Sequence, residues 1–144
     1  MAKELAPSEL FFNELVSKGL VIKGIGTDLL DQRRIAHIMA KQGERFARRI
    51  LTSQELLLWG EKENSVNFVA KRFAAKEAIS KALGTGIAQG IGFQQMNICA
   101  DDLGKPVVEL SGAALKRTKA MGGQQVLLSL SDEGEMILAF AVLS

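Results

Sequence analysis

The longest helical pattern in the chain carries a carboxylate on its apolar side. A helix turns by about 100° per residue, so one arc of the expected helix 66–83 holds Val66, Val69, Ala70 and Phe73. Glu77 falls within this arc, and Lys81 follows four residues later, in a favourable order for an ion pair. A carboxylate among core side chains is unfavourable unless it is paired or bound to a metal. The pattern therefore predicts either a structural Glu77–Lys81 ion pair or a catalytic or metal-binding Glu77.

A second candidate carboxylate, Asp28, ends the run Gly24-Ile25-Gly26-Thr27-Asp28 after an apolar strand expected over residues 20–26. One interpretation makes Asp28 a helix N-cap or turn residue, and the other makes it a functional carboxylate at a strand end. The two glycines do not form a dinucleotide-binding fingerprint, because the third glycine and the strand–helix–strand context are missing.

Gly84-Thr85-Gly86 directly follows the long helix and is typical of a helix C-cap and turn. With Lys81 one turn earlier, the glycines could also let the backbone approach a phosphate closely. Arg72 and Lys76 add positive charge to the same helix. Carboxylates suit magnesium, which takes further ligands from substrate phosphates, and lysine suits phosphoryl oxygens. The set indicates phosphoryl chemistry without naming the reaction.

The order of the expected elements predicts a single compact α+β domain within the 144 residues. Thr52 and Glu55 have the spacing of a capping box at the start of a helix. Further helices are expected over residues 31–42, 44–51 and 113–121, and strands over residues 92–100, 106–110, 125–131 and 136–143. Turns are expected at 102–104 and 132–134. The apolar strands of residues 125–143 exceed what one small sheet buries, which predicts a homotrimer.

Composition excludes several classes of protein. The net charge of +2 is too small to indicate nucleic acid by itself, and no apolar run is long enough to predict a membrane span. Cys99 is the one cysteine, so the chain forms no internal disulfide and fits a reducing cytoplasm. Residues 1–20 contain Glu4, Glu9 and Glu14 and lack a signal-peptide pattern. We expect an N-terminal extension with an amphipathic helix that begins near Pro7.

Six basic residues lie between positions 33 and 49, where Glu44 is the one acidic residue. They are Arg33, Arg34, Lys41, Arg45, Arg48 and Arg49. Such a run is either a solvated helix face or a docking surface for an acidic partner, whose encounter it would speed by long-range attraction. The near absence of interleaved aromatics, apart from Phe46, argues against a single-stranded nucleic-acid site.

Several of these segments together resemble the bacterial holo-acyl-carrier-protein synthases, the short trimeric type of phosphopantetheinyl transferase. The resemblance rests on Gly24 to Asp28 with Arg33-Arg34-Ile35, on residues 47–52, on Gly104-Lys105-Pro106 and above all on residues 68–87. It covers about residue 21 to the C-terminus, so residues 21–144 are expected to form the transferase domain. The sequence departs from the family at Asp132, where many members have histidine.

The resemblance implies a role for each matching residue. Members move phosphopantetheine from coenzyme A to a serine of an apo acyl carrier protein and release adenosine 3',5'-bisphosphate, with active sites between subunits. Asp28 and Glu77 match ligands of Mg²⁺, or of Mn²⁺ in its place, and Lys81 matches a catalytic lysine near the pyrophosphate. Coenzyme-binding positions match Phe68, Arg72, Lys81, Gly84, Gly86 and Pro106, and carrier-docking positions match Arg34, Arg45 and Phe46. Pro106 and a turn at residues 129–132 would come from the neighbouring subunit.

Three questions stay open at this stage. Either Glu77 or a metal-bound water would take the proton of the attacking serine. The carriers accepted could belong to fatty-acid synthesis, or a broader-range enzyme could act on polyketide or peptide-synthetase carriers. A non-catalytic carrier-binding protein is a third reading, against which the intact set of Asp28, Glu77 and Lys81 argues. The single-copy length argues against the broader-range type, whose members look like two fused copies of this unit.

Overall fold

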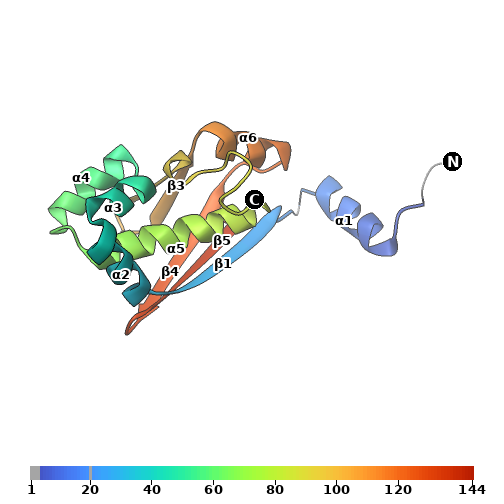
Figure 1. The fold of residues 1–144 in the computed structure, drawn as a ribbon. Helices are drawn as coiled ribbons and strands as arrows, with labels where there is room; N and C mark the ends of the chain where they lie inside the picture. The colour runs from blue at the N-terminus through green and yellow to red at the C-terminus, as the bar shows by residue number, and fades with distance from the viewer. Residues whose placement is uncertain (1–3, 20) are drawn as a thin grey trace.

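One long helix packed on a three-stranded antiparallel sheet forms the centre of the fold in the computed structural model (Figure 1). The structure describes residues 4–19 and 21–144. The elements are α1 (Pro7–Ser17), β1 (Gly24–Asp31), α2 (Gln32–Gln42), α3 (Glu44–Ile50), α4 (Ser53–Glu61), α5 (Val66–Ala82), β2 (Met96–Ala100), β3 (Pro106–Leu110), α6 (Gly112–Ala120), β4 (Val126–Glu133) and β5 (Met136–Leu143).

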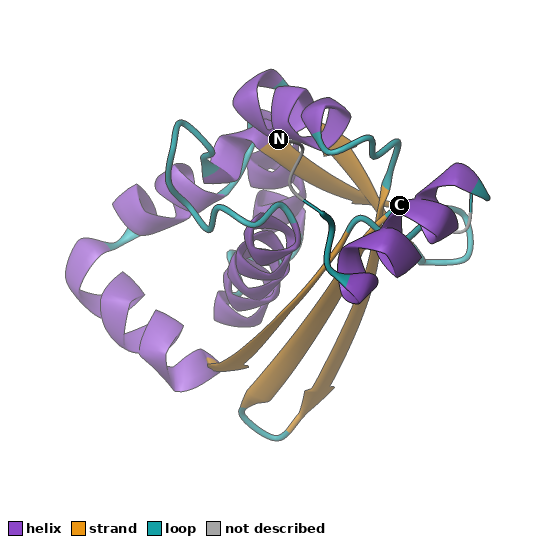
Figure 2. Cartoon of the chain, turned by 90° about the vertical axis from the view of Figure 1, so that its right-hand side faces the viewer, coloured by secondary structure: helices purple, strands orange, loops and turns teal. Residues whose placement is uncertain are grey.

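Two separate sheets account for the strands (Figure 2). The larger has the order β1-β5-β4, so the first strand of the domain pairs with the last, with Asp28 opposite Ala139. The smaller is the β2–β3 hairpin. The predicted α+β class is confirmed, since helices and antiparallel strands occupy separate stretches of the chain.

Side-chain caps fix where the helices begin. Asp31 caps α2 by accepting a hydrogen bond from the backbone N–H of Arg33 at 3.0 Å. The predicted capping box is present, because Thr52 accepts from the N–H of Glu55 and Glu55 accepts from the N–H of Thr52. Ser65 caps α5 in the same way through the N–H of Phe68. Each cap satisfies a donor that has no partner inside its helix.

α5 is buried around most of its circumference, unlike the one-sided helix of the sequence prediction. It packs on β1, β4 and β5 on one side and on α2 and α3 on the other. Its buried residues include Val69, Ala70, Ala74, Ala75, Ala78 and Ile79. The small side chains let the helix approach the sheet closely, which brings polar groups of α5 near those of β1.

Three predicted boundaries were wrong. The first strand is β1 at Gly24–Asp31 instead of residues 20–26, so Asp28 lies within a strand and Asp31 is the helix cap. Residues 93–95 form a short 3₁₀ helix ahead of β2. β4 continues to Glu133, so residues 129–132 belong to a strand, and the turn lies at Gly134 and Glu135. Strand pairing satisfies backbone N–H and C=O groups past the residues whose types suggest a turn. A paired strand therefore extends further than its sequence indicates.

The face of the larger sheet that points away from α5 is apolar and exposed. Its uncovered side chains are Ile25 and Leu29 of β1, Leu127 of β4, and Leu138 and Phe140 of β5. Strand alternation places these residues on one face, because buried and exposed positions alternate along each strand. α1 also exposes Leu10, Phe11 and Phe12. Within the described ranges, no helix has the length and apolar content to cross a membrane.

Candidate active site

Two glycines of β1 bring the strand unusually close to α5. A Cβ at Gly24 would lie 2.0 Å from the carbonyl oxygen of Ala82, and a Cβ at Gly26 would lie 2.0 Å from that of Ala78. Neither distance is possible for a real side chain, so only glycine permits this approach. Asp28 follows on the same face of β1. The Gly-x-Gly pattern therefore serves helix–strand packing, which sets Asp28 beside the last turns of α5.

Lys81 links this carboxylate to the helix. Its ammonium nitrogen donates to the carbonyl oxygen of Thr27 at 2.9 Å and to Oδ1 of Asp28 at 3.3 Å. One of the two interpretations paired Lys81 with Glu77 at i−4, whereas the ion pair in the structure joins Lys81 to Asp28 on the strand. The Asp28 side chain is 17% exposed and that of Lys81 is 51% exposed, so the pair lies at the edge of the solvent.

Glu77 lies half-buried beside these two residues. Burial raises the pKa of its carboxyl, and the nearby negative charge of Asp28 raises it further, while Lys81 and Arg34 act in the opposite direction. Two carboxylates that repel each other at the solvent edge, with oxygen ligands alone, are a donor set that suits a hard divalent cation. The described residues hold no group of three or more histidine, cysteine or acidic side chains that could bind a metal. Any magnesium here would take its remaining ligands from water and substrate.

The turn after α5 does not offer backbone donors to a phosphate in this conformation. The N–H of Gly84 donates to the carbonyl of Lys81, and those of Thr85 and Gly86 both donate to the carbonyl of Ser80. Gly84 and Gly86 have φ values of 76° and 64°, which favour glycine. The C-cap interpretation is therefore confirmed, and the close approach of a phosphate to this turn stays a prediction. The predicted coenzyme-binding role of Gly84 and Gly86 therefore rests on the close approach of a ligand to a backbone without side chains.

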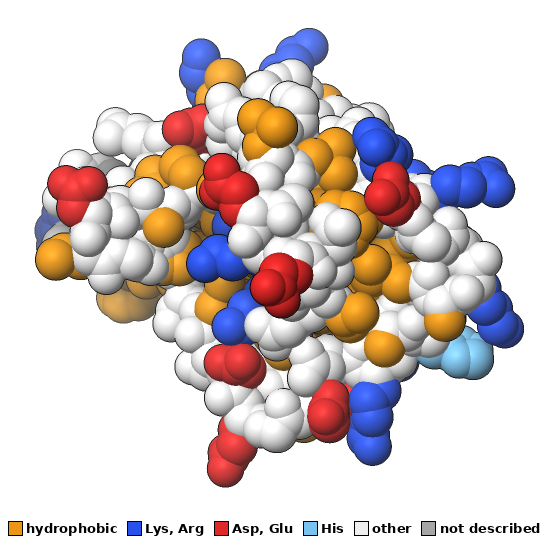
Figure 3. All heavy atoms as spheres, turned by 90° about the vertical axis from the view of Figure 1, so that its left-hand side faces the viewer, with side chains coloured by type: hydrophobic (Ala, Val, Ile, Leu, Met, Phe, Trp, Pro, Cys, Tyr) orange, Lys and Arg blue, Asp and Glu red, His pale blue; other side chains and the backbone are white. Residues whose placement is uncertain are grey.

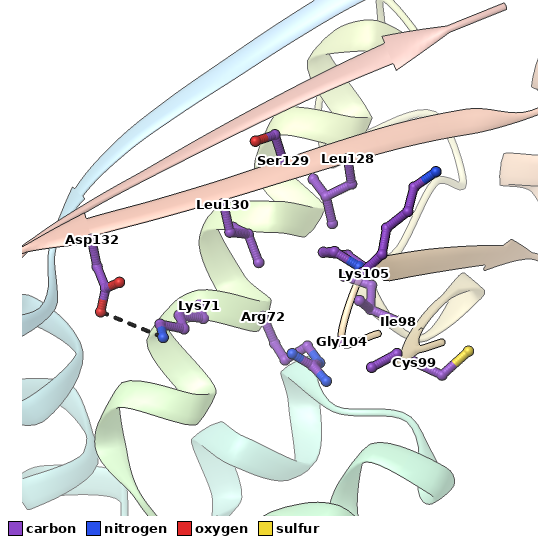
Figure 4. A pocket seen from close by; sticks show the side chains of 12 residues that line it. Lys71, Arg72, Ile98, Cys99, Gly104, Lys105, Leu128, Ser129, Leu130 and Asp132 are labelled. Carbon is purple, nitrogen blue, oxygen red and sulfur yellow. Dashed lines mark ion pairs between the residues drawn. The ribbon is translucent and has the colours of Figure 1, made fainter. Parts of the chain in front are cut away.

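Towards the other end of α5, side chains surround a cavity of about 420 Å³ (Figure 4). Lys71 and Arg72 of α5 face Gly104, Lys105 and Pro106 of the β2–β3 hairpin. β4 adds Leu128, Ser129, Leu130 and Asp132, and Asp132 pairs with Lys71 at 3.4 Å. Pro106 and residues 129–132, expected from a neighbouring subunit, thus line a cavity with Lys71 and Arg72 of their own chain.

A second cavity of about 570 Å³ adjoins the first and shares Lys71, Arg72 and Gly104 with it. Phe68 lines it, with its ring 4.5 Å from the guanidinium carbon of Arg72. The structure thus brings the predicted residues Phe68, Arg72 and Pro106 together around two connected cavities. Lys81, Gly84 and Gly86 line neither cavity and lie towards the C-terminal end of α5.

A buried ionic cluster beneath Arg72 was not predicted. The ammonium of Lys76 lies 2.5 Å from Oε1 of Glu55, and both side chains are fully buried. Burial lowers the pKa of Lys76, and Glu55 opposes that shift. Sequence reasoning took Lys76 as free positive charge and Glu55 as a cap. The available signal was weak, because Ala75, Ala78 and Ile79 lie near Lys76 on the helix but so do the charged residues Arg72 and Glu77.

The basic residues of α2 and α3 divide into paired and unpaired side chains. Arg33 pairs with Asp31 at 2.6 Å and Arg48 with Glu44 at 3.3 Å. Within residues 4–19 and 21–144, no ion pair involves the exposed residues Arg34, Lys41, Arg45 or Arg49. Figure 3 faces the end of the molecule formed by these helices and shows Lys and Arg side chains along one edge. We call these four residues the free basic surface.

Phe46, predicted to contact the carrier, does not belong to this surface. Its ring is 6% exposed and packs against Phe73, with ring centroids 6.1 Å apart. The apolar ring of Phe46 fills space between α3 and α5, where burial stabilises it more than exposure would. We therefore correct its role to one of support beneath Arg45, whose side chain is exposed.

Comparison with known proteins agrees with the resemblance seen in the sequence. A holo-[acyl-carrier-protein] synthase of Vibrio parahaemolyticus is 46% identical over 124 residues, which cover 86% of this chain and 98% of that protein. The crystal structure of the Neisseria meningitidis synthase superposes with a TM-score of 0.80 at 46% identity, over 86% of this chain and 99% of the other. The Helicobacter pylori synthase in complex with coenzyme A gives 0.73 at 28% identity, over 83% and 99%.

The family model that matches this chain covers its whole α+β core. It is described as the 4'-phosphopantetheinyl transferase superfamily and matches residues 24–140. The matched region begins at the first residue of β1 and ends within β5, so it contains Asp28, Glu77 and Lys81. The fold, the matched region and the identity to relatives agree, and the chain belongs to the 4'-phosphopantetheinyl transferase superfamily.

Proposed function

We propose that this protein transfers 4'-phosphopantetheine from coenzyme A to a serine of an apo acyl carrier protein. The observation that carries the proposal is the convergence of Asp28 from β1 with Glu77 and Lys81 from α5 inside a chain of this family. Two acidic groups and one cation at a solvent edge suit the transfer of an anionic phosphoryl group. The names of the relatives and the coenzyme A complex of the Helicobacter pylori synthase support the same substrates.

Asp28 and Glu77 would hold one Mg²⁺, since a bound cation would relieve the repulsion between the two carboxylates. A bound divalent cation supplies charge neutralisation at the pyrophosphate and at the leaving phosphate. Lys81 offers a mobile ammonium at the same place, already 3.3 Å from Asp28. When the pyrophosphate occupies the site, this ammonium can turn from Asp28 to the phosphoryl oxygens, as a flexible lysine stem allows.

The proposed transfer forms one bond and breaks one bond at phosphorus. The serine Oγ attacks the phosphorus that carries the pantetheine, and the bridging P–O bond breaks with its electron pair leaving on adenosine 3',5'-bisphosphate. The serine proton would pass to the carboxylate of Glu77 or to a water that a bound cation holds beside it. Lys81 would stabilise the charge that develops on the leaving group.

The cavities of α5 and the β2–β3 hairpin fit an elongated ligand that reaches back along the helix to Lys81. Arg72 stands nine residues before Lys81, roughly 13 Å along the helix axis at 1.5 Å per residue. Arg72 and Lys71 would bind anionic groups of coenzyme A, and Phe68 offers an aromatic face. We propose that Pro106 contacts the coenzyme from the hairpin side of the same cavity.

The free basic surface would dock the carrier protein by charge. Arg34 lies close enough to Glu77 to oppose the rise in its pKa, so this surface adjoins the proposed catalytic group. A carrier bound there could extend its serine towards Glu77, and docking would supply the orientation that the reaction needs. Arg34 and Arg45 are therefore the proposed docking residues, with Phe46 beneath them.

We also propose that the protein works as a homotrimer in the cytoplasm. The exposed apolar face of the sheet supports assembly, because exposed patches of this kind usually mark an interface. Active sites between subunits would then receive side chains from two chains. The cytoplasmic location rests on the single unpaired cysteine, Cys99, and on the proposed coenzyme substrate.

The transfer itself can be measured directly. The protein is mixed with coenzyme A, Mg²⁺ and an apo acyl carrier protein. The mass of the carrier is then measured by mass spectrometry. We expect the added mass of one phosphopantetheine, and none when chelator is in excess. Apo carriers from polyketide and peptide synthetases, offered in competition, report the range of partners. No added mass on any carrier would overturn the proposed function.

A further inference from the structure

A fully buried carboxylate joins three parts of the fold directly beneath the coenzyme cavities. Glu55 sits at the third position of α4 and accepts hydrogen bonds from the backbone N–H of Thr52 at 2.9 Å and of Ile98 at 3.1 Å. Lys76 of α5 donates at 2.5 Å to Oε1, the oxygen that also accepts from Thr52, and the Ile98 N–H donates to Oε2. The two Glu55 oxygens thus contact α4, α5 and β2, and the residue has no exposed surface. The carboxylate is held in place, because Lys76 and Ile98 contact it from buried positions and Thr52 from a partly buried one.

Arg72 connects this buried carboxylate to the cavities. Its Nε lies 3.2 Å from Oε2 of Glu55, although the N–H is too poorly aligned for a hydrogen bond. The guanidinium lies over the ring of Phe68 at 4.5 Å, and the side chain is 14% exposed. Arg72 lines both cavities. It is therefore held on one side by Glu55 and Phe68 and open on the other to a ligand.

Two cations share the single buried carboxylate. Lys76 is fully buried and lines neither cavity, whereas Arg72 lines both. With Glu55 and Lys76 both charged, their charges cancel, and the positive charge of Arg72 remains to attract an anion. A guanidinium with a fixed plane binds phosphate with less loss of side-chain freedom than a mobile one.

We propose that Glu55 is a positioning residue that orients Arg72 towards the anionic part of coenzyme A; this rests on the proposed function. Glu55 does not touch the ligand and acts through Arg72 alone. The competing role is purely structural, in which Glu55 closes the capping box and ties α4 to β2. A structural role would lower stability in any variant, but it would not act selectively on coenzyme binding.

Two variants separate the orientation of Arg72 from the net charge of the cluster, which only the double variant keeps at the wild-type value. Lys76→Met removes one cation and leaves Glu55 paired with Arg72. Glu55→Gln combined with Lys76→Met removes both buried charges and keeps the shape, so Arg72 loses its partner. We expect the single variant to bind coenzyme A more weakly than the wild type, because the charge of Glu55 is then offset by Arg72 alone, so this variant reports the effect of net charge. We expect the double variant to raise KM and Kd for coenzyme A about tenfold, on the scale of one lost charge-assisted contact. Its KM for the carrier should stay unchanged.

A third variant, Arg72→Met, allows a mutant-cycle analysis of coenzyme A binding. If Glu55 acts through Arg72, adding Glu55→Gln and Lys76→Met to Arg72→Met should change the affinity for coenzyme A no further, since coupled residues are not additive. Isothermal titration with coenzyme A measures the affinity separately from transfer, and thermal melts verify that each variant is folded. Wild-type affinity in the double variant, or a further loss in the triple variant, would overturn the positioning role alone. Failure of the wild type to bind coenzyme A would overturn the proposed function as well.

Discussion

The ammonium of Lys81 forms an ion pair with Asp28, one of the two carboxylates proposed as metal ligands, and its nitrogen lies 3.3 Å from Oδ1. The two residues stand 53 positions apart in the chain and meet because α5 packs tightly on β1. In the absence of substrate, this lysine and a metal ion would compete for the same carboxylate. The contact therefore ties metal affinity to the position of Lys81.

Removing Lys81 should separate metal binding from turnover. In Lys81→Met, Asp28 loses its competing cation, so we expect Mn²⁺, a spectroscopic substitute for Mg²⁺, to bind more tightly in the absence of coenzyme A. Turnover should nevertheless fall, on the order of 100-fold, because a charge near the leaving phosphate is gone. Electron paramagnetic resonance of free Mn²⁺ and the transfer assay measure the two effects. Weaker Mn²⁺ binding would contradict the competition.

The free basic surface predicts a selective loss of carrier affinity. Arg34→Glu or Arg45→Glu reverses the charge of an exposed side chain without an ion-pair partner among the described residues. We expect KM for the carrier to rise more than KM for coenzyme A, and added salt to weaken wild-type docking as charges become screened. Lys119→Glu, an exposed change on α6, is the charge-matched control. Equal effects on both substrates would reject the docking assignment.

The exposed sheet face predicts that one charge disrupts assembly. Phe140 is 41% exposed on β5 and lies opposite Thr27 of β1. Phe140→Asp should convert a homotrimer to smaller species, because burying an unpaired carboxylate in an interface is unfavourable. Leu57→Asp, at a residue that is 74% exposed on α4, should leave the mass unchanged. Multi-angle light scattering measures the mass of both variants and of the wild type. A wild-type protein that is a fully active monomer would refute the trimer.

How much the sequence predicts depends on the range of the interactions involved. The helix of α5, its C-cap and the capping box are local patterns, and all three are confirmed. The place of Glu77 at the edge of the core also follows from helical periodicity. The ion pair of Lys81 with Asp28 was not predictable, because i, i+4 spacing points to Glu77 and carries no information about a strand that packs from elsewhere in the chain.

The buried pair of Glu55 and Lys76 shows a second limit. A capping-box glutamate is usually exposed, and a lysine is seldom fully buried, so each residue taken alone suggests the surface. Their burial depends on β2, which supplies the N–H of Ile98 and closes the site. The same holds for Gly24 and Gly26, whose role in packing depends on Ala78 and Ala82, which lie more than 50 positions later in the chain.

A glycine-to-alanine substitution should lower the stability of the protein at Gly26, where β1 lies close to α5, and raise it at Gly60, where there is open space. Gly26→Ala would place a Cβ 2.0 Å from the carbonyl oxygen of Ala78, so the helix and strand must separate. We expect a loss of about 1–3 kcal/mol or more in the free energy of unfolding, as for other overpacked sites. Gly60→Ala in α4 meets no atom within 4 Å and should stabilise by about 0.5–1 kcal/mol. Urea unfolding measures both.

The final prediction separates function from stability at Glu77. Glu77→Gln keeps the shape of the side chain, removes its charge and cannot accept a proton, so turnover should fall at least ~100-fold, the scale of a lost general base. Without metal, the variant should be as stable as the wild type or more stable, because burial and Asp28 both disfavour the ionised carboxyl. If Glu77 served only to pair with Lys81, turnover would survive and stability would fall.

The pH dependence of this stability difference has a definite sign. The folded protein raises the pKa of Glu77, so it binds the proton more tightly than the unfolded chain does. The ionised carboxyl therefore destabilises the metal-free fold fully above the raised pKa, and the penalty fades as pH falls towards the ordinary glutamate range. We expect Glu77→Gln to gain most over the wild type near pH ~8 and least near pH ~5, in melts with chelator present. A gain that grows as the pH falls would show that Glu77 is stabilised by its charge.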